Sequence, residues 1–506
     1  MGTASRVPDH GDTDWSFRMT RTDIRFWYQG EIVSITAEAH TRTVLQWLRE
    51  TRGATGSKEG CGEGDCGACT VVLASLDAQG RDGLRLQAVN SCIALLPTLD
   101  GKALFTVEDL AGADALHPVQ QALVALHGSQ CGFCTPGFAM SLWADYEERD
   151  RVPDAREAQQ VVSGNLCRCT GYRPILDAAR RCREYPLQRL DRAPLRDTLN
   201  ALARTPALAY GPPGARFLAP RTLAEFARLR RELPDARILA GGTDVGLWIT
   251  KQLRTLGDIL YVGGVAELRE CRSEADALRI GAGVSLTDAF AALCADEPQW
   301  QALAERFASL PVRNAGTLGG NVANGSPIGD AMPGLIALGT RIVLRQGDAT
   351  RELPLEDFYL AYQKTALVPG EFVEALCVPR RAPGRLFRCW KISKRADQDI
   401  SAVCAAFLLE RDDAGHVRRA RLAFGGMAAT PARARAAEAA LLGRPFDAAA
   451  RDAAMAALAQ DFQPLSDMRA SSAYRLQVAR NLLQRLWLEQ AGAGSPAPLT
   501  LEELAS

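Results

Sequence analysis

The stretch Cys61-Gly-Glu-Gly-Asp-Cys66-Gly-Ala-Cys69 places three cysteines at C-x4-C-x2-C spacing, and a fourth, Cys92, follows further along the chain. A tight loop that supplies three thiolates and a later segment that supplies the fourth are typical of a plant-type 2Fe–2S cluster. Glycines suit such a loop, because the backbone must wrap closely around the inorganic sulfides, often with positive φ. A structural zinc site also uses four thiolates, but it prefers paired C-x2-C knuckles. The spacing therefore favours an iron–sulfur cluster over zinc, with four candidate ligands: Cys61, Cys66, Cys69 and Cys92.

A second set of four cysteines follows in two shorter motifs. Gln130-Cys131-Gly-Phe-Cys134-Thr-Pro contains a C-x2-C pair, and Leu166-Cys167-Arg-Cys169-Thr contains a C-x-C pair. Each pair precedes a predicted helix, over 138–146 and 175–182, with a proline suited to the first turn. The thiolates can then lie near helix N-termini, where the dipole stabilises negative charge. Zinc is a more serious rival at this site, whose candidate ligands are Cys131, Cys134, Cys167 and Cys169.

The composition bounds the class of protein. At 506 residues the chain is too long for one core, so two to four domains are expected. Its 59 basic residues balance its 59 acidic residues, which gives no electrostatic footprint for nucleic acid or an anionic membrane. No apolar run approaches the ~18 residues that span a bilayer, and the first residues lack the apolar core of a secretory signal. We therefore expect a cytoplasmic protein with no nucleic-acid or membrane partner.

Local patterns around the first cysteine loop predict a small sheet. Residues 24–35 read as two short strands joined at Gln29-Gly30, a hairpin signal. Thr43 is placed to cap a helix with one apolar face, and a buried strand is expected to leave the cysteine loop at Thr70. Hairpin, helix, cysteine loop and strand in this order resemble the β-grasp fold of plant-type ferredoxins.

Two glycine-rich segments lie further along the chain. The first, Leu239-Ala-Gly-Gly-Thr-Asp-Val-Gly246, follows a predicted strand and opens a helix, so that its N–H groups make an anion site suited to a pyrophosphate. This signal alone is weak, because no G-x-G-x-x-G with a following ribose-binding acid is present, and an ordinary strand–helix turn is the alternative. The second segment, residues 313–330, is a glycine-rich run that is costly to order for packing alone. Together the segments favour close approach of the backbone to a ligand.

The three cysteine motifs, in this order and separation, resemble the two-cluster module of the xanthine dehydrogenase and aldehyde oxidase family, with all eight ligand positions filled. In that family the second cysteine set lies nearer the molybdenum centre, and the ferredoxin-like set passes electrons on to a flavin. The resemblance implies that Gln130 contacts the pterin of the molybdenum cofactor. It also implies that the two glycine segments are the paired FAD-binding loops of the family's flavin domain, which is related to the vanillyl-alcohol-oxidase type.

The same resemblance implies a set of FAD contacts. Phe307 and Val373 would flank the isoalloxazine or the adenine, and Asp330 would bond to a polar part of the cofactor. Lys391 would lie near the flavin ring, where a cation stabilises the anionic reduced flavin; the alternative is a solvated surface lysine. The pyrophosphate would be held from one side by Leu239, Ala240, Gly241, Gly242, Thr243, Asp244, Val245 and Gly246, and from the other by Thr317, Leu318, Gly319, Gly320 and Asn321.

These readings predict an α+β multidomain fold. Its parts are a β-grasp ferredoxin-like domain, a four-helix 2Fe–2S domain, an α/β FAD-binding domain of the vanillyl-alcohol-oxidase type and an α+β C-terminal domain. An alternative for the first residues is that translation starts at Met19. The expected boundaries are a disordered extension over 1–21, the ferredoxin-like domain over 22–104, the helical domain over 105–184, a linker over 185–215, the FAD-binding domain over 216–382, the C-terminal domain over 383–490 and a tail over 491–506.

The resemblance also implies a function. The family's large molybdopterin domain does not fit in the remaining chain, so we expect an iron–sulfur and flavin subunit with no catalytic residue of its own. Its partner would be a large molybdopterin-binding subunit, with two copies of each subunit, that oxidises hypoxanthine to xanthine and xanthine to urate. Electrons would pass through the second cluster and then the first to FAD and out to NAD+.

Three alternatives remain open at this point. The partner could act on an aldehyde or another N-heterocycle, because the substrate pocket lies on the partner. The chain could be a stand-alone NADH-dependent electron-transfer protein. It could also be a zinc-stabilised binding module with no redox role.

Overall fold

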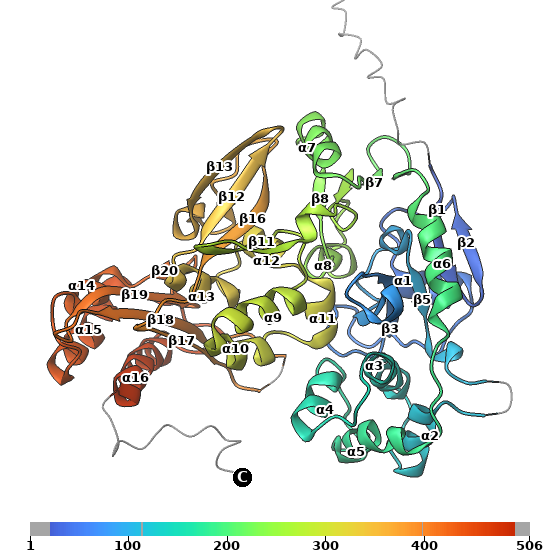
Figure 1. Ribbon diagram of the computed structural model, residues 1–506, viewed down its shortest axis with the longest axis horizontal. Coiled ribbons are helices and arrows are strands. Elements are labelled where there is room, and N and C mark those ends of the chain that lie inside the picture. The colour runs from blue at the N-terminus through green and yellow to red at the C-terminus, as the bar shows by residue number, and fades with distance from the viewer. Residues whose placement is uncertain (1–20, 113–114, 397, 491–506) are drawn as a thin grey trace, which may run out of the picture.

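The computed structural model describes residues 21–112, 115–396 and 398–490, so the expected tail and nearly all of the expected N-terminal extension lie outside the described residues. Figure 1 shows the ferredoxin-like part in blue and the helical part in teal at one end of the molecule. The FAD-type part lies in the middle, and the C-terminal domain, in orange and red, lies at the other end. Arg21, assigned to the extension, belongs instead to the fold, because it is buried and its guanidinium binds the Asp100 carboxylate.

The predicted β-grasp domain is confirmed as a mixed sheet of five strands in the order β2-β1-β5-β3-β4. The predicted hairpin turns at Gln29 and Gly30, both with positive φ, and Thr43 caps the following helix as expected. Trp47 packs edge-on against Phe26, which holds that helix on the sheet. The elements are β1 (Ile24–Tyr28), β2 (Glu31–Ile35), α1 (Val44–Gln46) with its π-helical continuation η1 (Trp47–Thr51), β3 (Thr70–Leu76), β4 (Leu84–Asn90) and β5 (Ala103–Phe105).

The predicted four-helix domain packs on one face of this sheet. The sheet and the other helices cover its central helix, α3 (Thr135–Glu148). This helix is therefore apolar on nearly all sides. Prolines occupy the first turns of the two helices that follow the cysteine pairs, as predicted. The helices are α2 (Pro118–Ala125), α3 (Thr135–Glu148), α4 (Ala155–Val162) and α5 (Arg173–Arg181).

The segment 185–215, predicted to be a linker, contains regular structure. Helix α6 (Arg192–Ala203) runs through its middle, and strand β6 (Leu208–Tyr210) follows. Leu195, Leu199 and Leu202 recur at helical spacing and are buried in the core shared with α3. The prolines and charges of the segment suggested a linker, but the apolar stripe decides its structure.

The FAD-type domain is built on two sheets. The first has the order β6-β7-β9-β8 with parallel pairing from β7 to β8, and the second, β10-β11-β16-β12-β13, is antiparallel. The strands are β7 (Phe217–Ala219), β8 (Arg237–Leu239), β9 (Ile259–Tyr261), β10 (Cys271–Ser273), β11 (Ala277–Gly281), β12 (Arg341–Gln346), β13 (Ala349–Pro354) and β16 (Phe372–Pro379), with a small hairpin of β14 (Tyr359–Ala361) and β15 (Lys364–Thr365). The helices are α7 (Leu223–Glu232), α8 (Val245–Thr250), α9 (Leu286–Asp296), α10 (Gln301–Arg306), α11 (Leu310–Ala315), α12 (Leu318–Asn324) and α13 (Ala331–Leu338).

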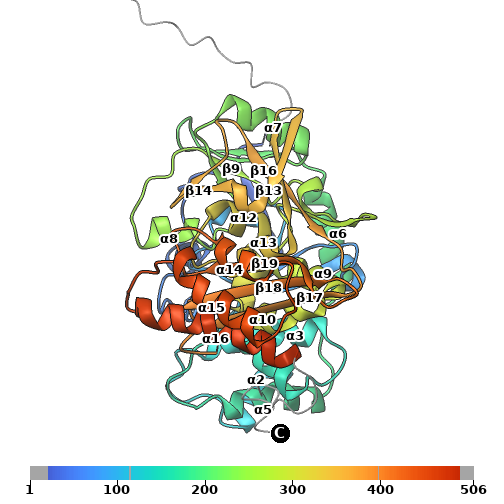
Figure 2. The same ribbon diagram turned by 90° about the vertical axis from the view of Figure 1, so that its left-hand side faces the viewer.

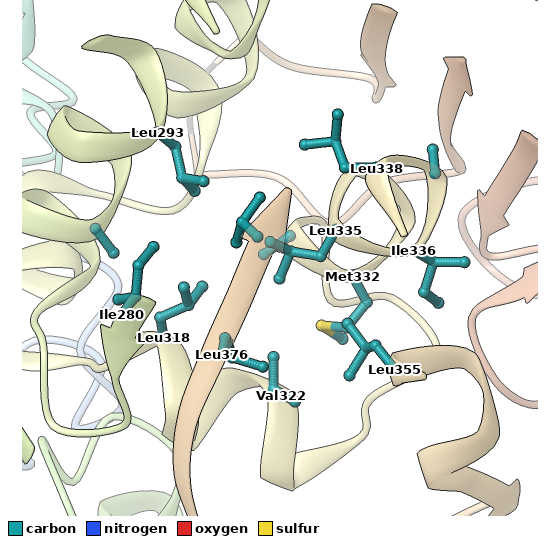
Figure 3. Close-up of a cluster of buried hydrophobic side chains, with 14 of the residues drawn as sticks. Ile280, Leu293, Leu318, Val322, Met332, Leu335, Ile336, Leu338, Leu355 and Leu376 are labelled. Atoms are coloured by element: carbon teal, nitrogen blue, oxygen red, sulfur yellow. The ribbon is translucent and has the colours of Figure 1, made fainter. Parts of the chain in front are cut away.

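Helix α13 joins this domain to the next one. All eight of its residues are buried, and Figure 3 shows its leucines and isoleucine in one cluster with side chains of β11, α9 and β16. Its other neighbours are the strands of the C-terminal sheet. Such complete burial explains why the helix carries no polar face.

The C-terminal domain is an antiparallel sheet of four strands with three helices on its outer face (Figure 2). Alternate residues of its second strand contact α13 on one side and the three helices on the other, so the strand is apolar almost throughout. Helix α15 was not predicted from the sequence, and a short strand, β20, precedes α14. The elements are β17 (Arg385–Ile392), β18 (Val403–Arg411), β19 (Val417–Gly425), β20 (Ala432–Arg433), α14 (Arg435–Leu441), α15 (Ala448–Asp461) and α16 (Ser472–Gln490).

None of the helices within the described ranges has both the length and the apolar character needed to cross a bilayer.

Candidate functional site

The first cysteine loop directs backbone N–H groups at sulfur atoms. The Cys61 Sγ atom accepts hydrogen bonds from the amides of Glu63, Asp65 and Cys66 at 3.4, 3.3 and 3.3 Å. The Cys66 Sγ atom accepts one from the Cys61 amide at 3.3 Å. Gly62, Gly64 and Gly67 have positive φ, which makes this tight path possible. The loop therefore stabilises negative charge on sulfur, as a thiolate ligand requires.

The structure brings the four cysteines of the first set together. Hydrogen bonds with Cys66 and then Cys92 hold the pKa of the Cys61 thiol far below its usual value. A hydrogen bond with Cys92 likewise lowers the pKa of Cys69, although burial alone would raise it. The pKa values of Cys66 and Cys92 are raised, in each case chiefly by the hydrogen bond with Cys61. The lowered pKa values favour the thiolate form at Cys61 and Cys69.

The second cysteine set is also assembled, but it lies nearer the surface. Burial, followed by a hydrogen bond with Cys167, raises the pKa of the Cys134 thiol to about 12. A hydrogen bond with Cys131 is the chief cause of the raised pKa of Cys169. Cys131 and Cys169 are exposed, whereas Cys69 and Cys92 of the first set are buried. The motif residue Phe133 is 47% exposed, so an apolar ring also stands at this surface.

Four thiols in mutual contact fit a two-iron cluster, which takes four thiolates, two on each iron. In the first set Cys61 hydrogen-bonds with both Cys66 and Cys92, and Cys92 also with Cys69; in the second, Cys167 hydrogen-bonds with Cys134 and Cys131 with Cys169. Over the ranges that the structure describes, no group of three or more His, Cys, Asp or Glu side chains, the cysteine sets included, is placed to hold a single metal ion. The glycines of the first cysteine loop also fit a cluster, because they let the backbone approach the sulfur atoms closely. A Cβ at Gly60 would lie 2.7 Å from the Cys66 Sγ atom.

The two cysteine sets are joined through their backbones. The Leu166 amide donates to the Cys66 carbonyl at 2.9 Å, and Leu166 immediately precedes Cys167. Asn165, which is 2% exposed, donates to the Gly67 carbonyl at 3.1 Å and accepts from the Ser141 hydroxyl at 2.6 Å. A Cβ at Gly67 would lie 2.0 Å from the Gly164 carbonyl oxygen, so the two loops touch as closely as backbones can.

The two glycine segments, far apart in sequence, form one wall of a cavity of about 1090 Å³. A Cβ at Gly241 would lie 1.8 Å from the Ala315 carbonyl oxygen, so the segments are pressed together. Of the predicted FAD contacts, those that line the cavity are Ala240, Gly241, Gly242, Thr243, Asp244, Val245, Phe307, Thr317, Gly319, Gly320, Asn321, Asp330, Val373 and Lys391.

Three predicted contacts do not line the cavity. Leu239, the last residue of β8, and Leu318, the first residue of α12, are fully buried in hydrophobic cores. Gly246 faces the ferredoxin-like domain, where a Cβ would lie 2.6 Å from the Ile93 carbonyl oxygen. Their place in the glycine segments therefore reflects packing.

One end of the cavity carries a buried ion pair. The Lys391 ammonium lies 2.7 Å from the Asp330 carboxylate, whose other oxygen accepts a 2.5 Å hydrogen bond from the Ser401 hydroxyl. Asn321 also lines the cavity, and its buried Oδ1 atom has no hydrogen-bond partner within the described part of the chain. An unpartnered buried acceptor is costly, so this oxygen fits a ligand that donates a hydrogen bond, as FAD can. The residues present therefore fit the cofactor.

Sequence reasoning missed an aromatic side chain of the cavity. Trp248 lines it from α8, with the guanidinium groups of Arg237 and Arg254 at 4.7 and 5.1 Å from the ring centroid. Burial raises the pKa of Asp244, although a hydrogen bond with Trp248 opposes that shift. The spacing of Trp248 four residues after Asp244 was the one signal that could have predicted this contact.

The first cysteine loop reaches the same cavity. Gly64 and Asp65 line it together with the glycine segments. Burial, followed by the charge on Cys61, raises the pKa of Asp65. No pattern in the sequence links Asp65 to residues almost two hundred positions away, so this contact emerges only from the fold.

Comparison with known proteins identifies each part of the chain. Four family models match it: the 2Fe-2S iron-sulfur cluster binding domain over 28–96, the 2Fe-2S binding domain over 106–180, the FAD binding domain in molybdopterin dehydrogenase over 213–381 and the CO dehydrogenase flavoprotein C-terminal domain over 388–490. Xanthine dehydrogenase of Emericella nidulans is 34% identical in an alignment 499 residues long that covers 87% of this chain and 36% of that protein. Xanthine dehydrogenase 1 of Arabidopsis thaliana is 30% identical in an alignment 477 residues long that covers 80% of this chain and 35% of that protein.

A solved structure agrees with these matches. Carbon monoxide dehydrogenase of Hydrogenophaga pseudoflava is 30% identical, with a TM-score of 0.50, over 53% of this chain and 94% of that one. The chain spans about a third of the length of the curated relatives that it matches. Its cysteine motifs, flavin-type domain and C-terminal domain follow one another along the chain, and the four family models match these parts in the same order. The chain therefore belongs to the molybdenum hydroxylase family, and it corresponds to the iron–sulfur and FAD-binding electron-transfer region of that family's proteins.

Proposed function

We propose that this chain is the electron-transfer subunit of a xanthine dehydrogenase that uses NAD+ as acceptor. One observation carries the proposal. The second cysteine set touches the first through the hydrogen bond from the Leu166 amide to the Cys66 carbonyl, and the loop that holds Cys66 lines the flavin-type cavity with Asp65. The three candidate sites thus form an unbroken series inside one chain, which is the arrangement that electron transfer needs.

We assign the first cluster to Cys61, Cys66, Cys69 and Cys92, and the second to Cys131, Cys134, Cys167 and Cys169. When bound, the clusters supply one-electron chemistry and FAD supplies the exchange between single electrons and hydride. The chain's own part is to hold the ligands and set their surroundings. The amides around Cys61 stabilise thiolate charge, and the burial of Cys69 and Cys92 excludes water from the first site.

In the cavity, Ala240 to Val245 and the segment from Thr317 to Asn321 would hold the cofactor, with Phe307 and Val373 beside its rings. Lys391 would place a positive charge near the flavin, and its partner Asp330 would fix the position of that charge. Because both side chains are almost fully buried, the pair acts in a medium where charges interact strongly.

The partner would be a large molybdopterin-binding chain, in an assembly with two copies of each subunit. The surface around the second set supports this, because Cys131 and Cys169 are exposed and the neighbouring side chains of Phe133 and Leu166 are 47% and 39% exposed. An exposed cluster with apolar neighbours fits a protein interface. The names of the curated relatives support xanthine as the partner's substrate, and we propose hypoxanthine as a second one.

The test is to express this chain with the molybdopterin-binding chain of its own genome and to follow NAD+ reduction with separate substrates. The proposal expects NADH formation with hypoxanthine and xanthine, and none with aldehydes, other N-heterocycles or carbon monoxide. A Cys169→Ala chain should assemble but fail to pass electrons to NAD+. Turnover of another substrate class, or none with purines, would contradict the assignment to xanthine dehydrogenase.

A further inference from the structure

We propose that Lys251, a residue of the flavin-type domain, sets the reduction potential of the cluster held by the first cysteine loop. The inference rests on the proposed function, in that it takes Cys61, Cys66, Cys69 and Cys92 as cluster ligands. It concerns a side chain outside the cysteine motifs, contributed by a different domain.

Helix α8 is fixed against the segment that carries the fourth cysteine. Gly246 and Gly242 face Ile93, where a Cβ on either glycine would lie 2.6 or 3.2 Å from the Ile93 carbonyl oxygen. Leu247, the next residue of α8, packs against a small buried cluster that contains Cys69 and Cys92. The helix therefore has one position relative to the cysteine loop, and so does the residue at its end.

Lys251 is that residue. It is the C-cap of α8, and its ammonium group donates a hydrogen bond to the carbonyl oxygen of Cys61. The same group lies 3.9 Å from the carboxylate of Glu63, two residues along the loop. A Cβ at Gly62 would lie 3.8 Å from the ammonium nitrogen, so the lysine end stands directly over the loop.

A cation at this position favours the reduced form of a bound cluster, because that form carries one more negative charge. The hydrogen bond to the Cys61 carbonyl adds to this effect. The ammonium offsets the partial negative charge of the carbonyl oxygen, which would otherwise disfavour negative charge on the nearby sulfur. Glu63 acts in the opposite direction and partly offsets the lysine. The Lys251 and Glu63 side chains are 44% and 43% exposed, so solvent weakens both effects without removing them, and both positions tolerate substitution.

The test is an anaerobic redox titration of the purified full chain, followed by low-temperature EPR, on wild type and on Lys251→Gln, Lys251→Arg and Glu63→Gln. A Cys169→Ala chain assigns the two cluster signals to their sites. In Lys251→Gln the first cluster should be harder to reduce, with its oxidised-to-reduced ratio raised three- to tenfold at a given potential; tenfold corresponds to 59 mV for a one-electron couple. Glu63→Gln should shift the same signal the other way, and Lys251→Arg should stay near wild type.

Two internal controls separate this role from a general effect. The second cluster should titrate unchanged in every variant, because Lys251 lies over the first loop only. Lys102 is a matched control, since its ammonium also crosses to the flavin-type domain, where it donates to the Tyr261 hydroxyl at 3.3 Å, but it does not touch the cysteine loop. Lys102→Gln should leave both clusters unchanged.

An unshifted first cluster in Lys251→Gln, or equal shifts of both clusters, would overturn the inference while the proposed function stands. A chain with no 2Fe–2S signal at all would overturn both. If Lys251→Gln does not fold, the opposite shift expected for Glu63→Gln still decides the matter, because an unchanged potential in that variant overturns the electrostatic account.

Discussion

The Lys391 ammonium lies 2.7 Å from the Asp330 carboxylate, and the two side chains are only 3% and 7% exposed. Lys391 is on β17 of the C-terminal sheet, and Asp330 precedes α13 of the flavin-type domain. The pair therefore joins two domains at the wall of the cavity that both side chains line. A buried ion pair of this kind is strongly destabilising when one partner is removed, because the other charge stays buried.

We expect Lys391→Met to destabilise the chain by about 3 kcal/mol and to reduce the amount of bound FAD, since the Asp330 carboxylate loses its ammonium partner. Urea unfolding and FAD content after purification measure the two effects. The double variant Lys391→Met with Asp330→Asn should recover part of the stability, because no unpaired charge remains. Additive losses in the double variant would show that the two side chains do not act as a pair.

Gly241→Ala should abolish FAD binding and leave both iron–sulfur clusters in place. The added methyl group would lie 1.8 Å from the Ala315 carbonyl oxygen, so the two glycine segments must separate. FAD release and iron content on the same sample measure the outcome. Gly112→Ala is the matched control, because among the described residues its methyl group would meet only the Ala115 carbonyl oxygen, at 3.7 Å. Normal FAD content in Gly241→Ala would show that the contact between the segments does not hold the cofactor.

Cys92→Ala should remove one of two 2Fe–2S signals and about half of the iron, because a cluster loses its fourth thiolate. Cys182→Ala is the control, since Cys182 is also a buried thiol but hydrogen-bonds to the Ala179 carbonyl within the helical domain. EPR and iron analysis distinguish the two variants. Full iron content in Cys92→Ala would remove this residue from the set of ligands.

The helical domain should lose stability in mild acid because of His117. Its Nδ1 atom accepts from the Val119 amide at 3.2 Å and so caps α2, and burial lowers the pKa of His117 to about 4. In the unfolded chain His117 takes up a proton near pH 6.5, whereas in the folded chain it does so only near pH 4. The contribution of this group to the free energy of unfolding is therefore fully present above pH 6.5 and is lost as the pH falls from 6.5 to 4.

We expect this one group to cost about 2 kcal/mol by pH 4, measured as the difference in thermal stability between wild type and His117→Asn across pH 4 to 7. Asparagine can cap the helix without a charge, so the variant should be less sensitive to acid. Parallel curves for the two proteins would rule out His117 as the source of acid sensitivity.

Several elements were predictable from sequence because their signals are local. The turn at Gln29-Gly30, the cap at Thr43 and the glycine segment before α8 are each decided by residues within a few positions. The grouping of the second cysteine set was likewise predicted, since both pairs sit in short motifs beside helices.

Other features depend on contacts between distant parts of the chain. Helix α6 was mistaken for a linker because its prolines and charges obscured the stripe of Leu195, Leu199 and Leu202, whose partners lie in another domain. The contacts of Asp65 with the cavity and of Lys251 with Cys61 arise from domain packing alone. Leu239, Gly246 and Leu318 show the reverse case, in which a position inside a binding motif serves packing.

The account depends most on the identity of the groups held by the eight cysteines and the cavity. The direct measurement is to quantify iron, zinc and FAD in the purified chain and to record low-temperature EPR after anaerobic reduction with NADH. We expect two distinct 2Fe–2S signals, about four iron atoms and one FAD per chain. Zinc without iron, or a chain without flavin, would contradict it.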